Sequence, residues 1–592
     1  MDREKIEERY KWDLSKIYSS IDDFRSDMQL VKDKMNDFSK YKDMMYDENT
    51  LYEVISLYME TSRILNKLEV YTSLLSDEDT GINKNRELKE EVSNLSSELI
   101  SKTYFIEPNI LKIDYSLIEK YYEKNEKLLE YKRYLYKLYR YKEHTLSDSE
   151  EKLLANLSKV FGNNYETYEL MKDSDMVFPN FVVDNKDYEL NNSNYSIYIE
   201  DDNRDIRKAA FDTLYETFKQ YKNVYGNLIT SNIKEEVSIS KIKKYKSALE
   251  AATYHDEIDE SIYNNLIDVI NDKIGVLHKY YDLKKEVLGL DELHLYDVYA
   301  NLVLEDRKEY GFESSKGTVI NALSILGDEY IDVLKKGIED RWIDVYPNKR
   351  KRTGGYSSGC YDTNPYILLN YQDKYDDMST MAHELGHSMH SYYTRTNNPY
   401  QYGHYSIFVA EVASTVNELI LAKYVIKNSN NKNEKLFILN RLMELFRATI
   451  YRQTMFAEFE KKIYEMIEED KPVSADTLSE EYYRLNEVYF GKNVVMDDYI
   501  KYEWARIPHF YYNFYVYKYA TGLSAASYIV NGLLDCTIKK EDYINFLKCG
   551  DSKSPLESLK VAGVDLSKKE VLISATEMFN SVIDEFREIY FK

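Results

Sequence analysis

The pentad His383-Glu384-Leu385-Gly386-His387 constrains this chain more than any other feature of the sequence. In a helix, residues four apart lie on one face, so His383 and His387 can present two imidazole nitrogens to one metal ion. Zinc binds histidine nitrogen, and Glu384 lies close enough to accept a proton from a metal-activated water. The pentad therefore predicts a helix that carries the centre of a zinc-dependent hydrolase.

The residues around the pentad favour a helix. An apolar stripe at helical spacing, on a different face from the two histidines, is formed by Met378, Met381, Ala382, Leu385 and Met389. The alternative is a charged helix whose histidines only form local hydrogen bonds. His390 lies near the same face, but the rise along a helix prevents donors at i, i+4 and i+7 from converging on one ion. We therefore expect His390 to be packed or hydrogen-bonded.

A third metal ligand is expected on a second helix, because catalytic zinc usually has three protein ligands and one open position. Glu411 interrupts the largely apolar segment 406–420, where a buried carboxylate is costly unless it is paired or bound to metal. We expect Glu411 to be the third ligand. Glu418 lies two turns further on and could orient a histidine through its free N–H, or could simply cap a helix or form a salt bridge.

The length and the net charge of the chain limit the classes of protein to which it can belong. A chain of 592 residues is too long for one compact core and should form two or more lobes. Its net charge of −24 disfavours nucleic-acid binding. Lys349-Arg350-Lys351-Arg352 is the one dense basic run and is expected to be a solvated loop, with contact to an acidic substrate group as the alternative.

The sequence predicts a cytoplasmic protein without a membrane partner. No apolar stretch approaches the roughly 20 residues that span a bilayer. The charged N-terminus, Met1-Asp2-Arg3-Glu4-Lys5, lacks the apolar core of a secretory signal. The three cysteines, Cys360, Cys536 and Cys549, are too few and too scattered for a disulfide framework and fit a reducing compartment.

With only 8 prolines and 19 glycines, the chain can form long helices. The expected elements are helices over 21–100 with a break at 76–80, a long helix over 117–141, a helix start at 147–150, a β-ribbon around 181–183 between 178 and 198, and helices over 204–336.

Two segments near the pentad depart from the helical pattern. Residues 353–359 read as a turn-rich loop, and 366–371 as a short strand. Such a strand could pair with an extended peptide by β-augmentation, or it could be structural with both edges covered. We expect the loop and the strand to orient a peptide backbone.

Several motifs together resemble oligoendopeptidase F, a group within the thimet-oligopeptidase-like zinc peptidases. The similar segments span essentially the whole chain and are 10–14, 76–80, 381–390, 408–415, 508–511 and 559–565. The resemblance implies a mainly α fold, a two-lobed helical shell enclosing a deep substrate channel, with a small β-sheet near the zinc helix. We expect an N-terminal helical region over 1–195 and a zinc metallopeptidase catalytic domain over 196–592.

The resemblance also implies an endopeptidase that hydrolyses internal bonds of short peptides. One Zn²⁺ per chain would be held by His383, His387 and Glu411, with Glu384 as the general base. In the wider family a histidine followed by two tyrosines spaced seven apart contacts the substrate and its oxyanion, and these roles carry over to His509, Tyr512 and Tyr519.

Two other functions remain open at the level of sequence. One is a helical zinc exopeptidase of the carboxypeptidase type built on the same pentad. The other is a non-catalytic peptide-binding protein with a relic zinc site, although the intact set of ligands and Glu384 argues against it. The sequence does not indicate the oligomeric state or the cleavage preference.

Overall fold

The computed structural model of the chain describes residues 2–158, 160–303 and 308–592. Most described residues lie in helices, and the strands are short, so the prediction of a mainly α fold is confirmed. The chain forms two compact units. The first unit comprises Met1–Glu143, Lys308–Tyr424 and Ile529–Gly563, and the second comprises His144–Arg307, Val425–Tyr528 and Val564–Lys592.

The first unit combines an N-terminal group of helices with the pentad helix and a small sheet. Its helices and strands are α1 (Ile21–Asp37), α2 (Glu48–Glu78), α3 (Asn83–Thr103), α4 (Ile106–Leu111), α5 (Tyr115–Lys124), α6 (Lys132–Arg140), α14 (Phe312–Leu323), α15 (Asp328–Glu339), β4 (Ile343–Asp344), β5 (Tyr356–Ser358), β6 (Tyr366–Leu368), α16 (Tyr375–Asn397), most of α17 (Ile407–Asn428), α22 (Lys540–Leu547) and α23 (Pro555–Val561). Short 3₁₀ turns connect several of them, among them η1 (Arg3–Lys5), η3 (Leu14–Lys16), η5 (Glu126–Tyr131) and η10 (Tyr400–Tyr402).

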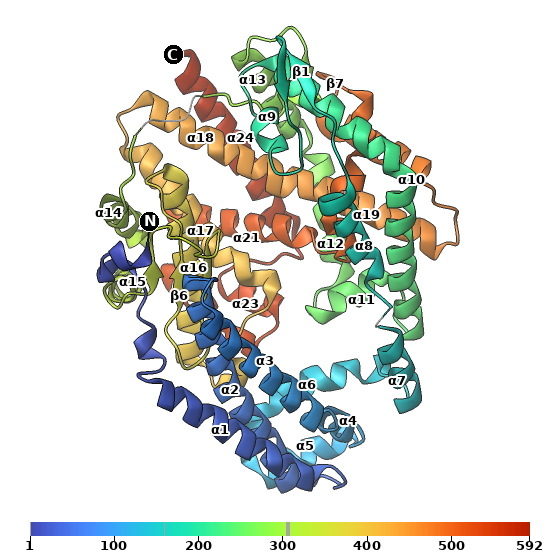
Figure 1. The fold of residues 1–592 in the computed structure, drawn as a ribbon, viewed down its shortest axis with the longest axis vertical. Helices are drawn as coiled ribbons and strands as arrows, with labels where there is room; N and C mark the ends of the chain where they lie inside the picture. The colour runs from blue at the N-terminus through green and yellow to red at the C-terminus, as the bar shows by residue number, and fades with distance from the viewer. Residues whose placement is uncertain (1, 159, 304–307) are drawn as a thin grey trace. The chain divides into compact units, whose positions relative to one another are not determined.

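Capping residues define the N-terminal helices, which are drawn in blue in Figure 1. Ser20 accepts the Asp23 N–H at the start of α1, and Asp47 accepts two backbone N–H groups at the start of α2. The predicted break falls between α2 and α3. The prediction of one long helix over 117–141 is wrong, because Asn125 has an extended backbone and its side chain caps a new 3₁₀ segment, η5.

The small sheet of the first unit has the order β4-β6-β5, and α16 packs against it. β6 pairs in parallel with β4 and antiparallel with β5, so it is the central strand. The predicted strand over 366–371 is therefore present but cannot pair with a peptide, because both of its edges are covered. The predicted loop over 353–359 contains β5, which pairing with β6 turns into an edge strand of this sheet.

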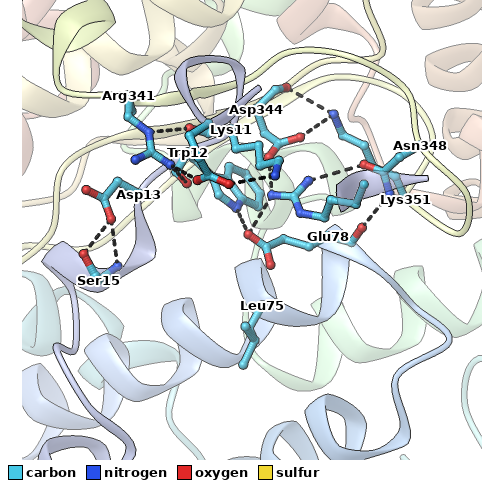
Figure 2. A network of polar contacts seen from close by, with 12 residues as sticks. Lys11, Trp12, Asp13, Ser15, Leu75, Glu78, Arg341, Asp344, Asn348 and Lys351 are labelled. Atoms are coloured by element: carbon cyan, nitrogen blue, oxygen red, sulfur yellow. Dashed lines mark hydrogen bonds and ion pairs between the residues drawn. The ribbon is translucent and has the colours of Figure 1, made fainter. Parts of the chain in front are cut away.

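A buried polar network joins the N-terminal segment to this sheet (Figure 2). Asp344 of β4 is 1% exposed, accepts a hydrogen bond from Arg3 Nη2 at 2.5 Å and forms an ion pair with Lys351 Nζ at 2.7 Å. Glu78, at the end of α2, accepts from the Trp12 indole at 2.6 Å and from Arg3 at 2.8 Å. Because buried charges must be paired, this network fixes β4 to both α2 and the first residues of the chain.

The basic run at 349–352 belongs to this structural chemistry. Lys351 is buried against Asp344, while Arg350 pairs with Asp79 at 2.7 Å and Arg352 with Asp77 at 3.2 Å. Lys349 lies 3.0 Å from Asp2. The expectation of a solvated loop therefore holds for Lys349, Arg350 and Arg352, which are exposed, and is wrong for Lys351, which tertiary packing buries against Asp344. These pairs attach the segment before β5 to the end of α2.

The second unit is built along the 39-residue helix α10 (Arg204–Ile242). Its other elements are α7 (Asp148–Leu157), α8 (Asn163–Leu170), β1 (Phe181–Val183), β2 (Lys186–Tyr188), α9 (Tyr195–Ile199), α11 (Ala248–His255), α12 (Glu260–Asp272), α13 (Gly275–Val287), β3 (Leu293–His294), α18 (Lys432–Phe446), α19 (Arg452–Glu468), α20 (Ala475–Phe490), β7 (Val494–Val495), most of α21 (Tyr517–Leu534) and α24 (Lys569–Phe591). Two 3₁₀ segments, η12 (Asp498–Arg506) and η13 (Pro508–Tyr511), precede α21.

Buried carboxylates hold this unit together. Glu503 of η12 is 2% exposed and accepts from Arg452 at 2.7 Å, from the Tyr482 hydroxyl at 2.6 Å and from the Tyr215 hydroxyl at 3.0 Å. Charge-assisted bonds of this kind offset the cost of removing the carboxylate from water. Glu503 thus joins α10, α19 and α20 to the segment that leads into η13.

Two predictions concern local structure in this unit, and a third covers residues 204–336, whose part from Lys308 onward belongs to the first unit. The helix start at 147–150 is confirmed, since Ser147 and Glu150 form a capping box at α7. The β-ribbon is confirmed as the β1–β2 hairpin, whose two turn residues both have positive φ, as a type I′ turn requires. Residues 304–307 of the range 204–336 lie outside the described residues, and helices dominate the rest of it. Among the described residues no helix combines the length and apolar composition needed to cross a membrane.

Candidate functional site

Packing of α16 turns the two histidines of the pentad away from the core. The predicted stripe is buried, with exposures of 1% or less for Met378, Met381, Ala382, Leu385 and Met389, while His383 and His387 are only half-buried. At the start of the helix the Asp377 carboxylate accepts the backbone N–H groups of Gln372 and Lys374, both at 2.9 Å. The helix is therefore fixed at its end and along its apolar face.

Three donor groups converge in the first unit. His383 Nε2 lies 3.1 Å from His387 Nε2, and Glu411 Oε2 of α17 lies 3.4 Å from the first nitrogen and 3.6 Å from the second. All three donor atoms lie within 4.8 Å of one another. Two imidazole nitrogens and one carboxylate oxygen at this separation can be spanned by a single ion with bonds of about 2.0–2.2 Å.

The close approach of α16 and α17 depends on a glycine. A Cβ built on Gly386 would lie 2.5 Å from Ser414 Cα and 2.7 Å from the Ala413 carbonyl oxygen. The Asn417 amide also donates to the Ala382 carbonyl at 3.0 Å and accepts from the Tyr330 hydroxyl at 3.1 Å. Backbone contact and this buried amide together bring Glu411 to the histidines.

Glu418 determines which nitrogen of His383 is available. Its carboxylate accepts from His383 Nδ1 at 3.1 Å and from the Ser379 hydroxyl at 3.2 Å. With Nδ1 as the donor, Nε2 keeps its lone pair and points toward His387 and Glu411. This contact matches the orientation of a histidine, and it is equally the salt bridge of the alternative role when His383 is protonated.

The electrostatics of the cluster favour a cation. Burial disfavours a charge on His383, yet hydrogen bonds to Glu411 and Glu418 raise its pKa to about 10. Hydrogen bonds to His383 and His387 hold the pKa of Glu411 well below its usual range. The negative field that draws a proton to His383 would equally draw a metal ion to the same lone pairs.

Glu384 differs from the carboxylates of Glu411 and Glu418. It is 7% exposed, and burial raises its pKa, opposed by the nearby His383 and His387. A carboxylate with a raised proton affinity beside a cluster that could hold a metal ion is suited to proton transfer.

His390 is packed, as the helical geometry predicted. Its ring is 1% exposed and stacks on Tyr405 with centroids 3.8 Å apart. The Tyr405 hydroxyl contacts the Ser391 hydroxyl at 3.0 Å. Burial, and to a smaller degree the charges of Glu411 and Glu384, raises the pKa of Tyr405. Sequence reasoning missed Tyr405, because its place beside the pentad helix depends on the turn between α16 and α17.

The second unit contains a separate histidine–tyrosine cluster. Three residues predicted to act together converge: His509 of η13, Tyr512 at the end of η13 and Tyr519 of α21. The His509 ring packs edge-on against both tyrosines, with centroids 5.5 Å from Tyr512 and 5.9 Å from Tyr519. His509 Nε2 lies 3.5 Å from the Tyr519 hydroxyl. Burial lowers the pKa of His509, which favours the neutral ring.

The Tyr512 hydroxyl has a partner that the sequence did not reveal. It lies 2.8 Å from the Tyr165 hydroxyl of α8, which in turn donates to Glu169 at 2.7 Å. Tyr512 is itself 42% exposed, so its ring borders solvent while its hydroxyl is held. No sequence signal links Tyr165 to Tyr512, which lies 347 residues further along the chain.

Comparison with known proteins gives one family. The family model "Peptidase family M3" matches residues 197–578, and the model "Oligopeptidase F" matches residues 109–178. Oligopeptidase PepF of Bacillus subtilis is 41% identical over 594 residues, covering 100% of this chain and 89% of that protein.

Solved structures of peptidases are similar to this chain in both sequence and fold. Oligoendopeptidase-F from Enterococcus faecium is 30% identical, covers 96% of this chain and 99% of its own, and superposes with a TM-score of 0.74. A structure from Chlamydophila abortus described as a peptidase is 34% identical, covers 99% of both chains and has a TM-score of 0.93.

Proposed function

We propose, from the premise that this chain belongs to peptidase family M3, a role for each residue of the two clusters. The chain is a metalloendopeptidase that hydrolyses internal bonds of oligopeptides. Members of this family are zinc peptidases. The convergence of His383, His387 and Glu411 is the observation that carries the residue-level proposal.

The donor set fits zinc. Two imidazole nitrogens and one carboxylate oxygen are typical ligands of a catalytic zinc that keeps one open position, and Glu418 holds His383 in the tautomer that a metal ligand needs. We assign one zinc ion per chain to His383, His387 and Glu411. When bound, the ion supplies Lewis-acid polarisation of a water molecule and of the scissile carbonyl.

Glu384 is the proposed general base. It lies beside the first ligand in sequence, and it is buried with a raised pKa. It would take the proton of the attacking water as that oxygen bonds to the carbonyl carbon, and then deliver the proton to the leaving amine as the C–N bond breaks.

His509, Tyr512 and Tyr519 are the proposed substrate-binding residues. The hydroxyl of Tyr512 would exchange its bond to Tyr165 for one to the carbonyl oxygen and donate there as negative charge develops, which is where a hydrogen-bond donor accelerates acyl transfer. His509 and Tyr519 would contact the substrate beside it. The support is the spacing of the motif and the contact of His509 with both tyrosines.

The edge strand β5 is proposed to orient the peptide backbone. An exposed strand edge can accept an extended chain by β-augmentation. β5 is fastened to α16 by the Ser357 hydroxyl, which lies 2.8 Å from the Ser388 hydroxyl, one residue after His387. A peptide on this edge would therefore be held in register with the donor helix.

We propose residues 196–592 as the catalytic domain and 1–195 as an N-terminal helical region, supported by the family model that begins at residue 197.

We also propose a cytoplasmic location, which is supported by the three cysteines, all of them free. The proposed partners are short peptides and not nucleic acid, which is supported by the net charge of −24.

The test is cleavage of an internally quenched peptide blocked at both ends, with chelator and with zinc added back. We expect internal cleavage that stops with the chelator and returns with zinc. A zinc-loaded protein that cuts only peptides with free termini would instead be an exopeptidase. Binding of peptides without cleavage would support the non-catalytic alternative.

A further inference from the structure

Two consecutive residues between η13 and α21 have a left-handed backbone. Asn513 has φ of 52° and Phe514 has φ of 54°. Positive φ is uncommon outside glycine and is an outlier for a bulky residue such as phenylalanine. Strain of this kind persists only where the surroundings over-determine it, and it gathers at functional sites. This turn follows Tyr512 directly and precedes α21, the helix that carries Tyr519, so its conformation affects where Tyr512 lies relative to the start of that helix.

The Asn513 side chain is bound at both ends of its amide. The Tyr464 hydroxyl of α19 donates to Asn513 Oδ1 at 3.0 Å. Asn513 Nδ2 donates to the Glu236 carboxylate of α10 at 2.8 Å. Two helices that are far apart in sequence therefore hold the first strained residue by its side chain.

Phe514 is held by its backbone and its ring. Its N–H donates to Glu460 Oε1 of α19 at 2.7 Å. Its ring is 1% exposed and packs on Tyr464 and Tyr263, with centroids 4.4 and 5.6 Å away. The three hydrogen bonds to the turn and this packing leave it little freedom.

Burial of the Glu460 carboxyl group lowers the stability of the folded protein unless its interactions compensate. It is 2% exposed, and among the described residues its Oε2 has no hydrogen-bond partner. Burial raises its pKa to about 8, although the Phe514 N–H favours the charged form. A neutral carboxylic acid can still accept one hydrogen bond through its carbonyl oxygen, which is the use made of it here.

We propose that Glu460 and Asn513 are positioning residues that hold the turn at 513–514 in its strained form and so aim Tyr512 and Tyr519 for catalysis. This proposal rests on the role given above to Tyr512. Neither positioning residue need touch the substrate. A small displacement of a donor hydroxyl is sufficient to reduce the rate of the chemical step.

The test compares three variants in the full-length, zinc-loaded protein with the blocked quenched peptide. Glu460→Met removes the acceptor at similar size, Glu460→Gln retains an acceptor, and Tyr464→Phe removes only the hydroxyl that holds Asn513. Glu458→Met is the matched control, because Glu458 lies on the same helix but contacts Asn271 and Tyr489 instead of the turn.

For Glu460→Met we expect kcat to fall by about 10- to 100-fold while zinc content stays at one per chain. The KM should change by less than about 3-fold, since the lost interaction acts mainly in the transition state. Glu460→Gln should restore most of this loss, Tyr464→Phe should lower kcat by a smaller factor, and Glu458→Met should match the parent protein. Tyr464→Phe keeps the proposal testable if Glu460→Met fails to fold.

A double variant separates this proposal from the one on which it rests. If Glu460 acts through Tyr512, adding Glu460→Met to Tyr512→Phe should lower kcat by less than about 3-fold further. Independent multiplication of the two losses would overturn the positioning role, as would a Glu460→Gln protein as slow as Glu460→Met. A fully active Tyr512→Phe protein would instead overturn the proposed role of Tyr512.

Discussion

The two clusters are built by different means. The donors His383, His387 and Glu411 lie in the middle of regular helices, and their arrangement follows from a four-residue spacing and the close packing of α16 on α17. His509 and Tyr512 lie on a 3₁₀ turn and at its end, and Tyr519 lies in the first turn of α21, which begins at Tyr517 after two strained residues, Asn513 and Phe514. One cluster is rigid because of helix geometry, and the other because side chains of α10 and α19 hold a turn.

This difference matches the two tasks proposed for the clusters, which are to coordinate a metal ion and to position a hydrogen-bond donor. A metal site needs lone pairs at fixed separations, which a helix pair supplies without strain. A hydrogen-bond donor for a developing charge needs one direction in space, which an irregular turn can supply where a helix cannot. We therefore expect changes in the first cluster to act on zinc or on proton transfer, and changes in the second to act on turnover and substrate binding without loss of zinc.

The largest effect is expected for Glu384→Gln in the first cluster. The amide cannot accept the proton of the attacking water, so kcat should fall by about 10³- to 10⁴-fold. Zinc content, measured by metal analysis, should remain one per chain because Glu384 is not among the converging donors. Substantial turnover by a folded, zinc-loaded variant would contradict the general-base assignment.

A smaller effect is expected for Tyr512→Phe in the second cluster. Loss of one donor to the developing oxyanion should lower kcat by about 10²-fold without loss of zinc. Tyr515→Phe is the matched control, because its ring packs near Tyr512. If the loss occurs at Tyr515 instead, the carried-over register of the motif is wrong.

Glu418→Ala should weaken zinc binding and so sharpen the contrast with the second cluster. Removal of the acceptor of the His383 Nδ1–H frees the ring to rotate and change tautomer, so zinc affinity should fall by about 10- to 100-fold. Competition with a chelator of known affinity measures this change. With saturating zinc most of the activity should return, whereas equal affinity in variant and parent would exclude the orienting role.

The smallest expected effect is a change in thermal stability with pH, and it concerns Glu460, which binds the turn next to the second cluster. Burial raises the pKa of Glu460 to about 8 from an ordinary value of 4.5, so its contribution to stability is fully present below pH 4.5 and is lost as pH rises toward 8. Glu460→Gln has no such proton. Its Tm relative to the parent protein should therefore rise by roughly 2–4 °C between pH 5 and pH 8. A constant difference across this range would mean that Glu460 is charged in the folded protein.

The convergence of His383, His387 and Glu411 could be predicted from sequence because most of its determinants are local. The spacing of His383 and His387 and the apolar stripe define one helix, and Glu411 is conspicuous in an apolar segment. The contact of Glu418 with His383 was anticipated for the same reason. The contribution of Gly386 was not, because only the packed partner helix reveals that a Cβ has no room there.

The remaining features depend on tertiary contacts. Nothing in residues 353–359 reveals an edge strand until β6 lies beside it, and nothing in the basic run shows that Lys351 alone is buried until Asp344 is in place. The strained turn at 513–514 contains no glycine to mark it. Asn125 broke a helix that periodicity predicted to be continuous, because its capping side chain outweighed the pattern.

The network around Asp344 has a consequence for the time at which the protein can complete its fold. Arg3 must wait for Asp344, which is translated 341 residues later, and the first unit also needs Ile529–Gly563. At about 5–20 residues per second, the last segment leaves the ribosome roughly half a minute to two minutes after the first. Until Asp344 has been translated, Glu78 is the one acidic residue of this network available to Arg3, so the first unit can complete its fold only late in synthesis.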